Sequence, residues 1–217
     1  KTKMAIKKSE LYSTLWRSCD ELRGGMDASQ YKNYVLTLLF VKYVSDKAKY
    51  NVESLIEVPE GCSFDDMVNL KGKTNIGEQM NIKLAAWEEA NDLDGMFKEA
   101  DFSDESKLGK GKDLVQTVSN LIGIFQSSGL NFGKNQASDD DLMGDAYEYL
   151  MKHFATESGK SKGQFYTPAE VSRVMAKVIG LNKETRPNVS IYDPTCGSAS
   201  LLLRALSEAS NGAALYG

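Results

Sequence analysis

Apolar residues recur three and four positions apart through most of the first 130 residues, which is the spacing of amphipathic α-helices. Ser9 is a good N-cap for the first of these segments, and Gly24 and Gly25 end it. The second segment carries apolar residues on more than one face, as is typical of the central helix of a bundle. Helices are expected over 9–23, 27–49, 63–70, 76–91 and 114–125. Because strand signals are scarce here, residues 1–137 are predicted to form a helical domain.

Beyond residue 137 the pattern changes, because short strand-like runs now alternate with helical ones. Val189, Ile191 and Tyr192 form such a run, and Pro194 ends it because proline cannot donate to a sheet ladder. Helices are expected over 138–154, 168–179 and 200–206, and strands over 189–192 and 213–216. This order predicts that residues 138–217 begin a domain of the α/β class.

The helix expected after residue 167 has clear start and stop signals. Thr167 is a typical N-cap, Pro168 suits the first helical position, and Glu170 completes a capping box. Gly180 is placed to end the helix. Its apolar residues share one stripe that is predicted to pack inward: Val171, Val174, Met175, Val178 and Ile179.

A tight turn joins the strand that ends at Asp193 to the next helix. Gly197 allows the backbone to turn sharply, and Ser198 or Ser200 is expected to cap the helix. Free N–H groups and the helix dipole point outward together at such a turn, which favours the binding of an anion. The carboxylate of a methionine-containing cofactor is one such anion.

Composition limits the cellular setting of the chain. Its 217 residues are 41% hydrophobic, which is enough for one large domain or two small ones. The longest apolar run, over 34–44, is interrupted by Thr37 and Lys42 and is too short to span a membrane. A signal peptide and a disulfide framework are not expected, so the protein is predicted to be cytoplasmic with no membrane contact. The net charge of −4 argues against a chain that coats nucleic acid by itself.

Three short motifs mimic reactive or nucleotide-binding sites and are interpreted as ordinary structure. Cys196 lacks an evident base, because the only histidine, His153, lies in a predicted helix without an orienting partner. Neither Cys196 nor His153 is therefore assigned a catalytic role, and no metal site is expected. The Gly-Lys-Thr at 72–74 lacks the upstream glycine of a P-loop, and the Gly-Lys-Gly-Lys at 109–112 is followed by Asp113. Both are predicted to be turns.

Two of these segments together resemble known cofactor-binding motifs. Gln-Phe-Tyr-Thr-Pro at 164–168, followed by Asp-Pro-Thr-Cys-Gly-Ser at 193–198, is similar to the two S-adenosylmethionine motifs of N6-adenine DNA methyltransferases. The family often has glycine at the position of Ala199, where this chain departs. The resemblance implies that 138–217 begin a Rossmann-like S-adenosylmethionine-dependent methyltransferase domain. The cofactor site that it implies is lined by Gln164, Phe165, Tyr166, Thr167, Pro168, Ala169, Asp193, Gly197, Ser198, Ala199 and Ser200.

The resemblance extends over nearly the whole chain. The stretches at 9–16, 22–31 and 144–155 look like the modification (methyltransferase) subunit of type I restriction–modification enzymes, in which a helical domain precedes the methyltransferase fold. It implies methyl transfer to adenine N6 in double-stranded DNA. It also implies assembly with a DNA specificity subunit, a second modification subunit and a restriction (nuclease) subunit.

Two parts of such a site are missing from these 217 residues. The family's catalytic Asn/Asp-Pro-Pro-Phe/Tyr tetrapeptide does not occur, and Asp193-Pro194 is followed by Thr195 instead. A ribose-binding carboxylate about 20 residues beyond the glycine turn would fall at or after Gly217. We therefore expect an amino-terminal fragment that is inactive by itself. Two alternatives stay open, a non-catalytic helical module that docks onto a specificity subunit and DNA, and a methyltransferase acting on RNA or protein.

Overall fold

The computed structural model describes residues 8–23, 28–49, 56–126, 130–133, 142–157, 167, 169–183, 186, 188–197 and 199–217. The chain divides into two compact units, residues 1–150 and 151–217, which are considered separately. No helix in these described ranges is long and apolar enough to cross a lipid bilayer.

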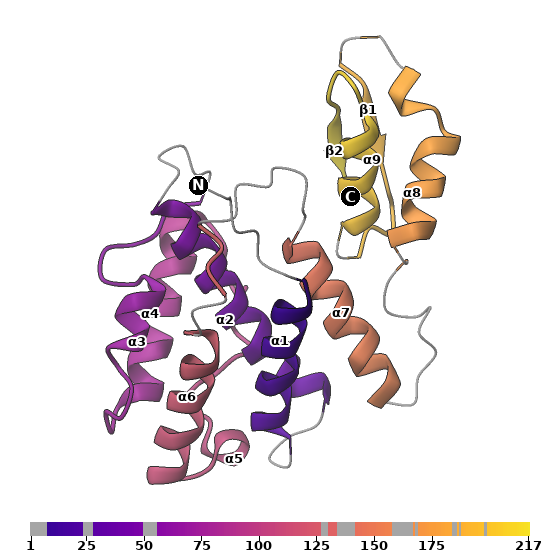
Figure 1. Ribbon diagram of the computed structural model, residues 1–217. Coiled ribbons are helices and arrows are strands. Elements are labelled where there is room, and N and C mark those ends of the chain that lie inside the picture. Colours follow the sequence, from indigo (N-terminus) through magenta and orange to yellow (C-terminus); the bar gives the residue numbers. More distant parts are fainter. Residues whose placement is uncertain are drawn as a thin grey trace, which may run out of the picture. The chain divides into compact units, whose positions relative to one another are not determined.

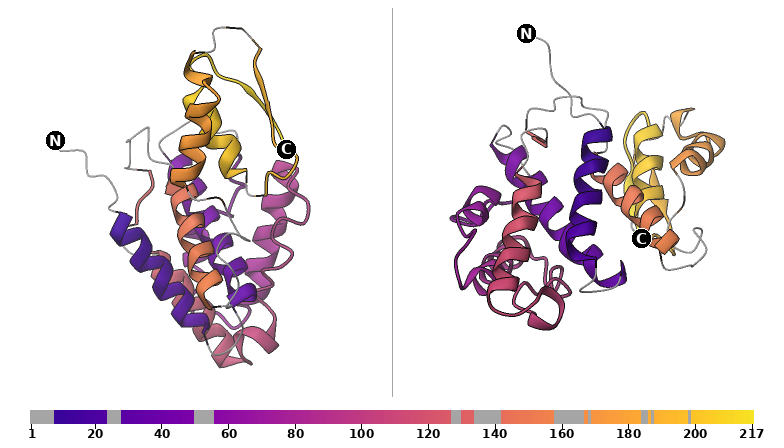
Figure 2. Two further views of the ribbon diagram at one scale, coloured as in Figure 1. Left: turned by 90° about the vertical axis from the view of Figure 1, so that its right-hand side faces the viewer. Right: turned by 60° about the horizontal axis from the view of Figure 1, so that its bottom comes forward.

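The first unit is helical, as the spacing of its apolar residues predicts. Its helices are α1 (Lys8–Leu22), α2 (Ala28–Ala48), α3 (Phe64–Val68), α4 (Ile76–Asn91), α5 (Glu105–Leu108), α6 (Lys112–Phe125) and the first part of α7 (Leu142–Glu157). Helix α2 contacts α1, α3 and α6 (Figure 1), which confirms its predicted central place. The two views in Figure 2 show α1 and α2 side by side.

Helix α2 is central because its buried residues face several directions. The apolar residues of α2 that are at most 5% exposed are Tyr31, Tyr34, Val35, Leu38, Leu39, Val41 and Val44. Two charged residues, Lys42 and Asp46, are buried with them. They form an ion pair, in which Lys42 Nζ lies 2.7 Å from Asp46 Oδ2. The same carboxylate oxygen accepts a hydrogen bond from the backbone N–H of Phe132 at 3.1 Å. The pair therefore joins α2 to the segment 130–133.

Hydrogen bonds and close packing hold the shorter helices and turns against the core of the first unit. Ser63 and Asp66 form the capping box that opens α3, as their spacing predicts. In α4, Trp87 is fully buried and its indole N–H donates to Cys62 O at 2.8 Å. Gly77 lets α4 approach another segment closely, because a Cβ atom there would lie 2.3 Å from Phe102 O.

The second unit contains α8 (Ala169–Val178), the short 3-10 helix η2 (Leu181–Lys183), β1 (Ser190–Tyr192), α9 (Ser200–Glu208) and β2 (Ala214–Tyr216). The strands are parallel, with Ile191 opposite Leu215, and both lie where the sequence predicts them. Helix α8 packs along α9, and α9 contacts β1. The strand–turn–helix–strand order is thus confirmed. The two strands among the described residues are too few to establish a Rossmann-like sheet, and that part of the expected fold stays a prediction.

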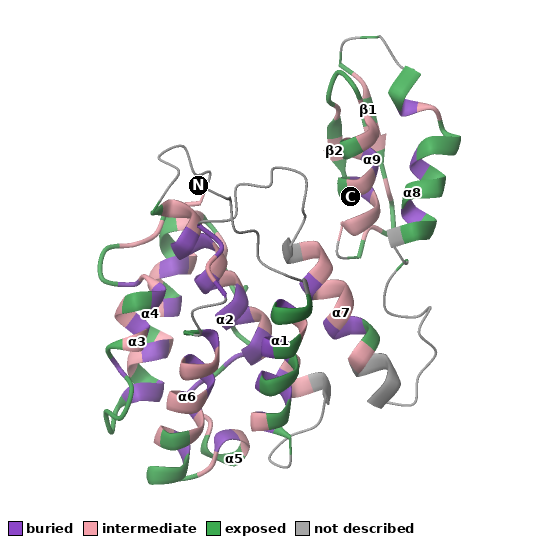
Figure 3. Cartoon of the chain, in the orientation of Figure 1, coloured by how far each residue is buried: buried purple, intermediate pink, exposed green. Residues whose placement is uncertain are grey.

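The orientation predicted for α8 is wrong. Its buried residues are the small Ser172 and Ala176, each 1% exposed, and they belong to the side of α8 that packs along α9. The five larger apolar residues that were expected inside are 45% to 79% exposed: Val171, Val174, Met175, Val178 and Ile179. Figure 3 shows α8 as a mainly exposed helix with narrow buried bands. Small side chains allow two helices to approach closely. The face of α8 that carries Ser172 and Ala176 is therefore the one that packs against α9.

Candidate functional site

The turn after β1 is held by the side chain of its first residue. The backbone N–H of Asp193 donates to Tyr216 O at 2.9 Å and so extends the parallel pairing by one bond. Asp193 Oδ1 accepts from the backbone N–H of Thr195 at 3.0 Å and from Thr195 Oγ1 at 3.3 Å. Such an Asx turn sets the direction in which the chain leaves the sheet. The carboxylate of Asp193 therefore shapes the turn.

The backbone of the turn passes twice through the left-handed region. Gly197 has φ of 54°, as expected of a glycine at a sharp turn. Ala199 has φ of 59° and ψ of 10°, and its N–H donates to Cys196 O at 2.8 Å. A residue with a Cβ atom is strained in this conformation, whereas glycine is not. The geometry thus explains why glycine suits the position where this chain has Ala199.

The start of α9 differs from the prediction in its cap. Ala199 is the N-cap and offers no side-chain hydrogen bond, and Ser200 is already the first helical residue. The expectation that Ser200 caps the helix is wrong, and Ser198 lies outside the described residues. The N–H groups of the first turn of α9 receive no acceptor from the side chain of its N-cap residue, Ala199. An external anion such as a carboxylate is a suitable acceptor for them.

The segment 164–169 is described only in part. Gln164, Phe165, Tyr166 and Pro168 lie outside the described residues, Thr167 is exposed, and Ala169 is the first residue of α8. Helix α8 covers Ala169–Val178, and Pro168, its predicted first residue, lies outside the described residues. Since α8 packs along α9, the helices that follow the two motifs belong to one compact unit. That the motifs themselves meet around a ligand stays a prediction.

Cys196 packs inside the turn. A Cβ atom built on Gly217 would lie 2.6 Å from Cys196 Sγ and 3.3 Å from Leu202 Cδ1, so the thiol fills the space between the turn, α9 and the end of β2. This environment agrees with the interpretation of Cys196 as a small residue in a tight turn. Within the described ranges, no group of three or more histidine, cysteine and carboxylate side chains is arranged to hold a metal ion.

Comparison with known proteins decides the family. A model described as "HsdM N-terminal domain" matches residues 11–125, more than half of the chain, and one described as "N-6 DNA Methylase" matches residues 138–215. The chain belongs to the family of type I restriction–modification methylase subunits.

Individual relatives agree with this assignment. The type I restriction enzyme MpnII methylase subunit of Mycoplasma pneumoniae is 28% identical over 88% of this chain and 43% of its own length. The EcoKI methylase subunit of Escherichia coli is also 28% identical, over 91% of this chain and 34% of its own length. A type I methyltransferase subunit from Streptococcus thermophilus has a similar structure, with a TM-score of 0.71 and 26% identity over 97% of this chain and 52% of that one. The chain thus spans between a third and about half of these relatives.

Proposed function

We propose that this chain forms the amino-terminal part of a type I restriction–modification methyltransferase that methylates adenine N6 in double-stranded DNA. One observation carries the proposal, namely that the N-6 DNA methylase model matches residues 138–215 and so includes both segments of the candidate site. The match of the helical unit to the HsdM amino-terminal model supports the type I class. The proposed partners are a DNA specificity subunit, a second modification subunit and a restriction subunit.

The proposed cofactor is S-adenosylmethionine, which supplies an electrophilic methyl group when bound. We infer that the turn binds its carboxylate end, because Gly197 adds no side chain there and the N-cap Ala199 has no side chain that could accept from the first turn of α9. Asp193 fixes that turn through Thr195. We propose that residues 164–169 close over the cofactor and that residues 197–200 approach its methionine end.

The adenine must leave the base stack so that its amino nitrogen can align with the methyl group. No residue of this chain is assigned to that step, since the Asn/Asp-Pro-Pro-Phe/Tyr tetrapeptide does not occur among the 217 residues.

The proposal is tested with the full-length subunit and its specificity partner. Methyl transfer from labelled S-adenosylmethionine to an adenine-containing duplex is measured, and digestion to nucleosides should locate the label in N6-methyladenine. A duplex already methylated at the target adenines is the control and should accept no label. Label in cytosine, or none in DNA under conditions where the assembly binds the duplex, would refute the assignment.

A matched pair of glycines tests the site itself. Gly197 and Gly212 both have positive φ, 54° and 74°, and a Cβ atom on either meets no atom closer than 3.9 Å. Gly197→Ala and Gly212→Ala should therefore cost similar backbone strain. Only Gly197→Ala should weaken the binding of S-adenosylmethionine to the full-length subunit, because only that residue is proposed to contact the cofactor. A loss of about 1.4 kcal/mol of binding free energy would raise the dissociation constant about tenfold. If the two variants bind S-adenosylmethionine with equal affinity, the turn is not part of the cofactor site.

A further inference from the structure

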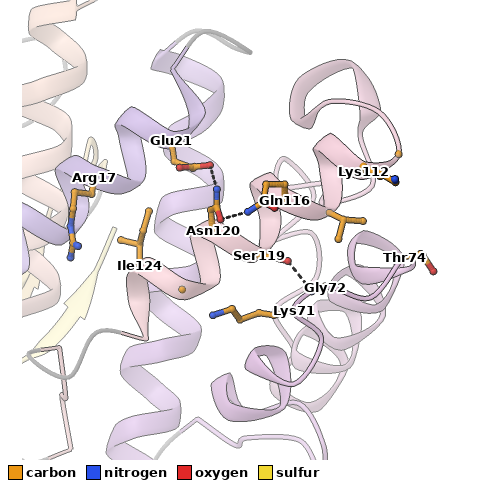
Figure 4. A pocket seen from close by; sticks show the side chains of 13 residues that line it. Arg17, Glu21, Lys71, Gly72, Thr74, Lys112, Gln116, Ser119, Asn120 and Ile124 are labelled. Atoms are coloured by element: carbon orange, nitrogen blue, oxygen red, sulfur yellow. Dashed lines mark hydrogen bonds between the residues drawn. The ribbon is translucent and has the colours of Figure 1, made fainter.

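The helical unit has a large hollow that is lined by none of the residues of the candidate cofactor site. It has a volume of about 1110 Å³ and opens between α1, the turn before α4, and the exposed side of α6 (Figure 4). We call it the α6 hollow. The side chains on which the argument rests are Arg17, Glu21, Lys71, Lys112, Gln116 and Asn120. Its volume lies slightly above the 300–1,000 Å³ that is usual for small-molecule pockets and leaves room for a segment of a larger partner.

One row of α6 runs along the hollow. Lys112, Gln116, Asn120 and Ile124 follow at intervals of four and all line it. From the first to the last of them the helix rises about 18 Å, which matches about five residues of an extended chain. Beside this row Gly123 has no side chain, and the Lys71 ammonium lies 3.3 Å from where its Cβ atom would be. The hollow therefore has a length that suits an extended strand of peptide, and the Lys71 ammonium lies over its floor at Gly123.

The polar groups of the row are connected to α1. Gln116 Nε2 donates to Asn120 Oδ1 at 2.6 Å, and Asn120 Nδ2 donates to Glu21 Oε1 at 2.8 Å. Figure 4 shows these bonds as a chain across the hollow. The carbonyl oxygen of Gln116 and the second carboxylate oxygen of Glu21 are further acceptors, and each amide has a second N–H. Such a row offers both donors and acceptors, as a peptide backbone requires.

The charge of the hollow is opposite to that of the chain. Arg17, Lys71 and Lys112 line it together with a single carboxylate, that of Glu21, whereas the whole chain has a net charge of −4. None of the three cations forms an ion pair within the part of the chain that the structure describes. The ammonium of Lys71 donates to the amide oxygen of Gln126, at 3.1 Å. An acidic ligand would supply the missing counter-charges.

Two turns that look unremarkable in the sequence meet here. The Gly-Lys-Thr turn at 72–74 and the Gly-Lys-Gly-Lys turn at 109–112 both contribute to the lining. The backbone N–H of Gly72 donates to Ser119 Oγ at 3.0 Å and so fixes the first turn against α6. Neither is a P-loop. Lys71, directly before the first turn, and Lys112, the first residue of α6, both line the hollow and come from separate segments.

We propose that the α6 hollow binds an extended acidic segment of a partner protein, with Gln116, Asn120 and Glu21 contacting its backbone and Arg17, Lys71 and Lys112 its carboxylates. A nucleic-acid backbone is the other anionic candidate, but its phosphates only accept hydrogen bonds, and Glu21 repels them. A peptide also donates through its N–H groups, so Glu21 is an attractive partner for it. The proposal does not depend on the cofactor site or on methyl transfer.

Fluorescence anisotropy of the 217-residue chain with labelled hexaglutamate tests the proposal. The probe should bind, hexaglutamine should not, and added salt should weaken binding. Arg17→Gln/Lys71→Gln/Lys112→Gln should weaken it about tenfold or more, since each exposed ion pair contributes a modest amount. The matched control is Lys73→Gln/Lys98→Gln/Lys110→Gln, which removes the same charge from three exposed lysines, none of which lines the hollow. Equal losses in both triple variants would reduce the effect to net charge and overturn the proposal.

Two further arms separate the possible ligands. Gln116→Ala/Asn120→Ala should weaken hexaglutamate binding about threefold to tenfold through lost backbone hydrogen bonds, and no change would refute backbone recognition. A labelled oligothymidine should bind more weakly than hexaglutamate. If it binds more tightly and depends on the same three cations, the hollow is a nucleic-acid site and the proposal is wrong. Circular dichroism and urea midpoints of every variant show that its fold is kept.

Discussion

The buried ion pair of α2 offers a demanding test of the fold. Lys42 and Asp46 have side chains that are only 10% and 4% exposed, and their charged atoms lie 2.7 Å apart. The ammonium of Lys42 is also 5.1 Å from the centre of the Phe64 ring. Asp46→Ala would remove both the counter-charge of Lys42 and the acceptor for the backbone N–H of Phe132. It would leave a buried cation and a buried N–H group without partners.

The magnitude follows from these two losses. Removing one partner of a buried ion pair typically costs about 3–5 kcal/mol, and an unsatisfied buried N–H about 1–3 kcal/mol. The two terms overlap, because the chain can shift to relieve both, so we expect the free energy of unfolding to fall by about 4 kcal/mol. The double variant Lys42→Met/Asp46→Leu removes both charges and should lose about 1–2 kcal/mol, mainly for the Phe132 N–H.

Urea unfolding followed by tryptophan fluorescence measures this loss. Both tryptophans, Trp16 and Trp87, lie in the first unit, so the signal reports on that unit. The matched control is Lys49→Gln, because Lys49 pairs with Asp65 at 2.6 Å while their side chains are 46% and 64% exposed. That exposed pair should contribute at most about 1 kcal/mol. A loss for Asp46→Ala no larger than that for Lys49→Gln would refute the reasoning.

Three other expectations concern single positions. Gly77→Ala should lower the free energy of unfolding in urea by about 1–3 kcal/mol, because the new Cβ atom would clash with the backbone of Phe102. In Gly123→Ala the new Cβ atom would contact only the end of the Lys71 side chain, so this control should be neutral or stabilising. Burial raises the pKa of Tyr34, and the negative charges of the nearby Asp104 and Asp101 raise it further. Above about pH 10 the folded protein therefore keeps the phenolic proton of Tyr34, whereas the unfolded chain loses it. Stability should therefore fall with rising pH above that value, and Tyr34→Phe should lessen the slope of unfolding free energy against pH. Ala199→Gly should relieve the positive φ and slow hydrogen exchange in α9 by up to about fivefold, or about 1 kcal/mol; faster exchange would show that Ala199 is unstrained.

The sequence predicts the first unit well because its signals are local. The capping box of Ser63 and Asp66 and the many apolar faces of α2 depend on residues a few positions apart. In α8 the same reasoning locates the helix but gives the wrong inward face. Helical periodicity shows that an apolar stripe exists, whereas the partner of that stripe depends on distant segments. Ser172 and Ala176 lie inside because they fit closely against α9.

The candidate site is predictable to a similar extent. The sequence places the turn after β1 at Asp193 and identifies Gly197 as its flexible position, and the structure confirms both. It does not reveal that Ala199 adopts positive φ, although the glycine that relatives often have there is a usable signal. Sequence motifs do not predict the α6 hollow, because its three cations lie far apart in the sequence and only the packing of the helices brings them together.

Helix α7 shows why a boundary based on sequence families and one based on packing need not coincide. The N-6 DNA methylase match begins at residue 138, whereas the first compact unit extends to Leu150. The ring of Tyr149 stacks on that of Tyr12 in α1, with centroids 4.4 Å apart, and Ala146 and Leu150 are fully buried. Residues matched by the methylase model thus contribute to the core of the helical unit. An isolated helical half that keeps this core must therefore include α7 as far as Leu150, since ending it at residue 137 would remove the stacked ring and both buried side chains.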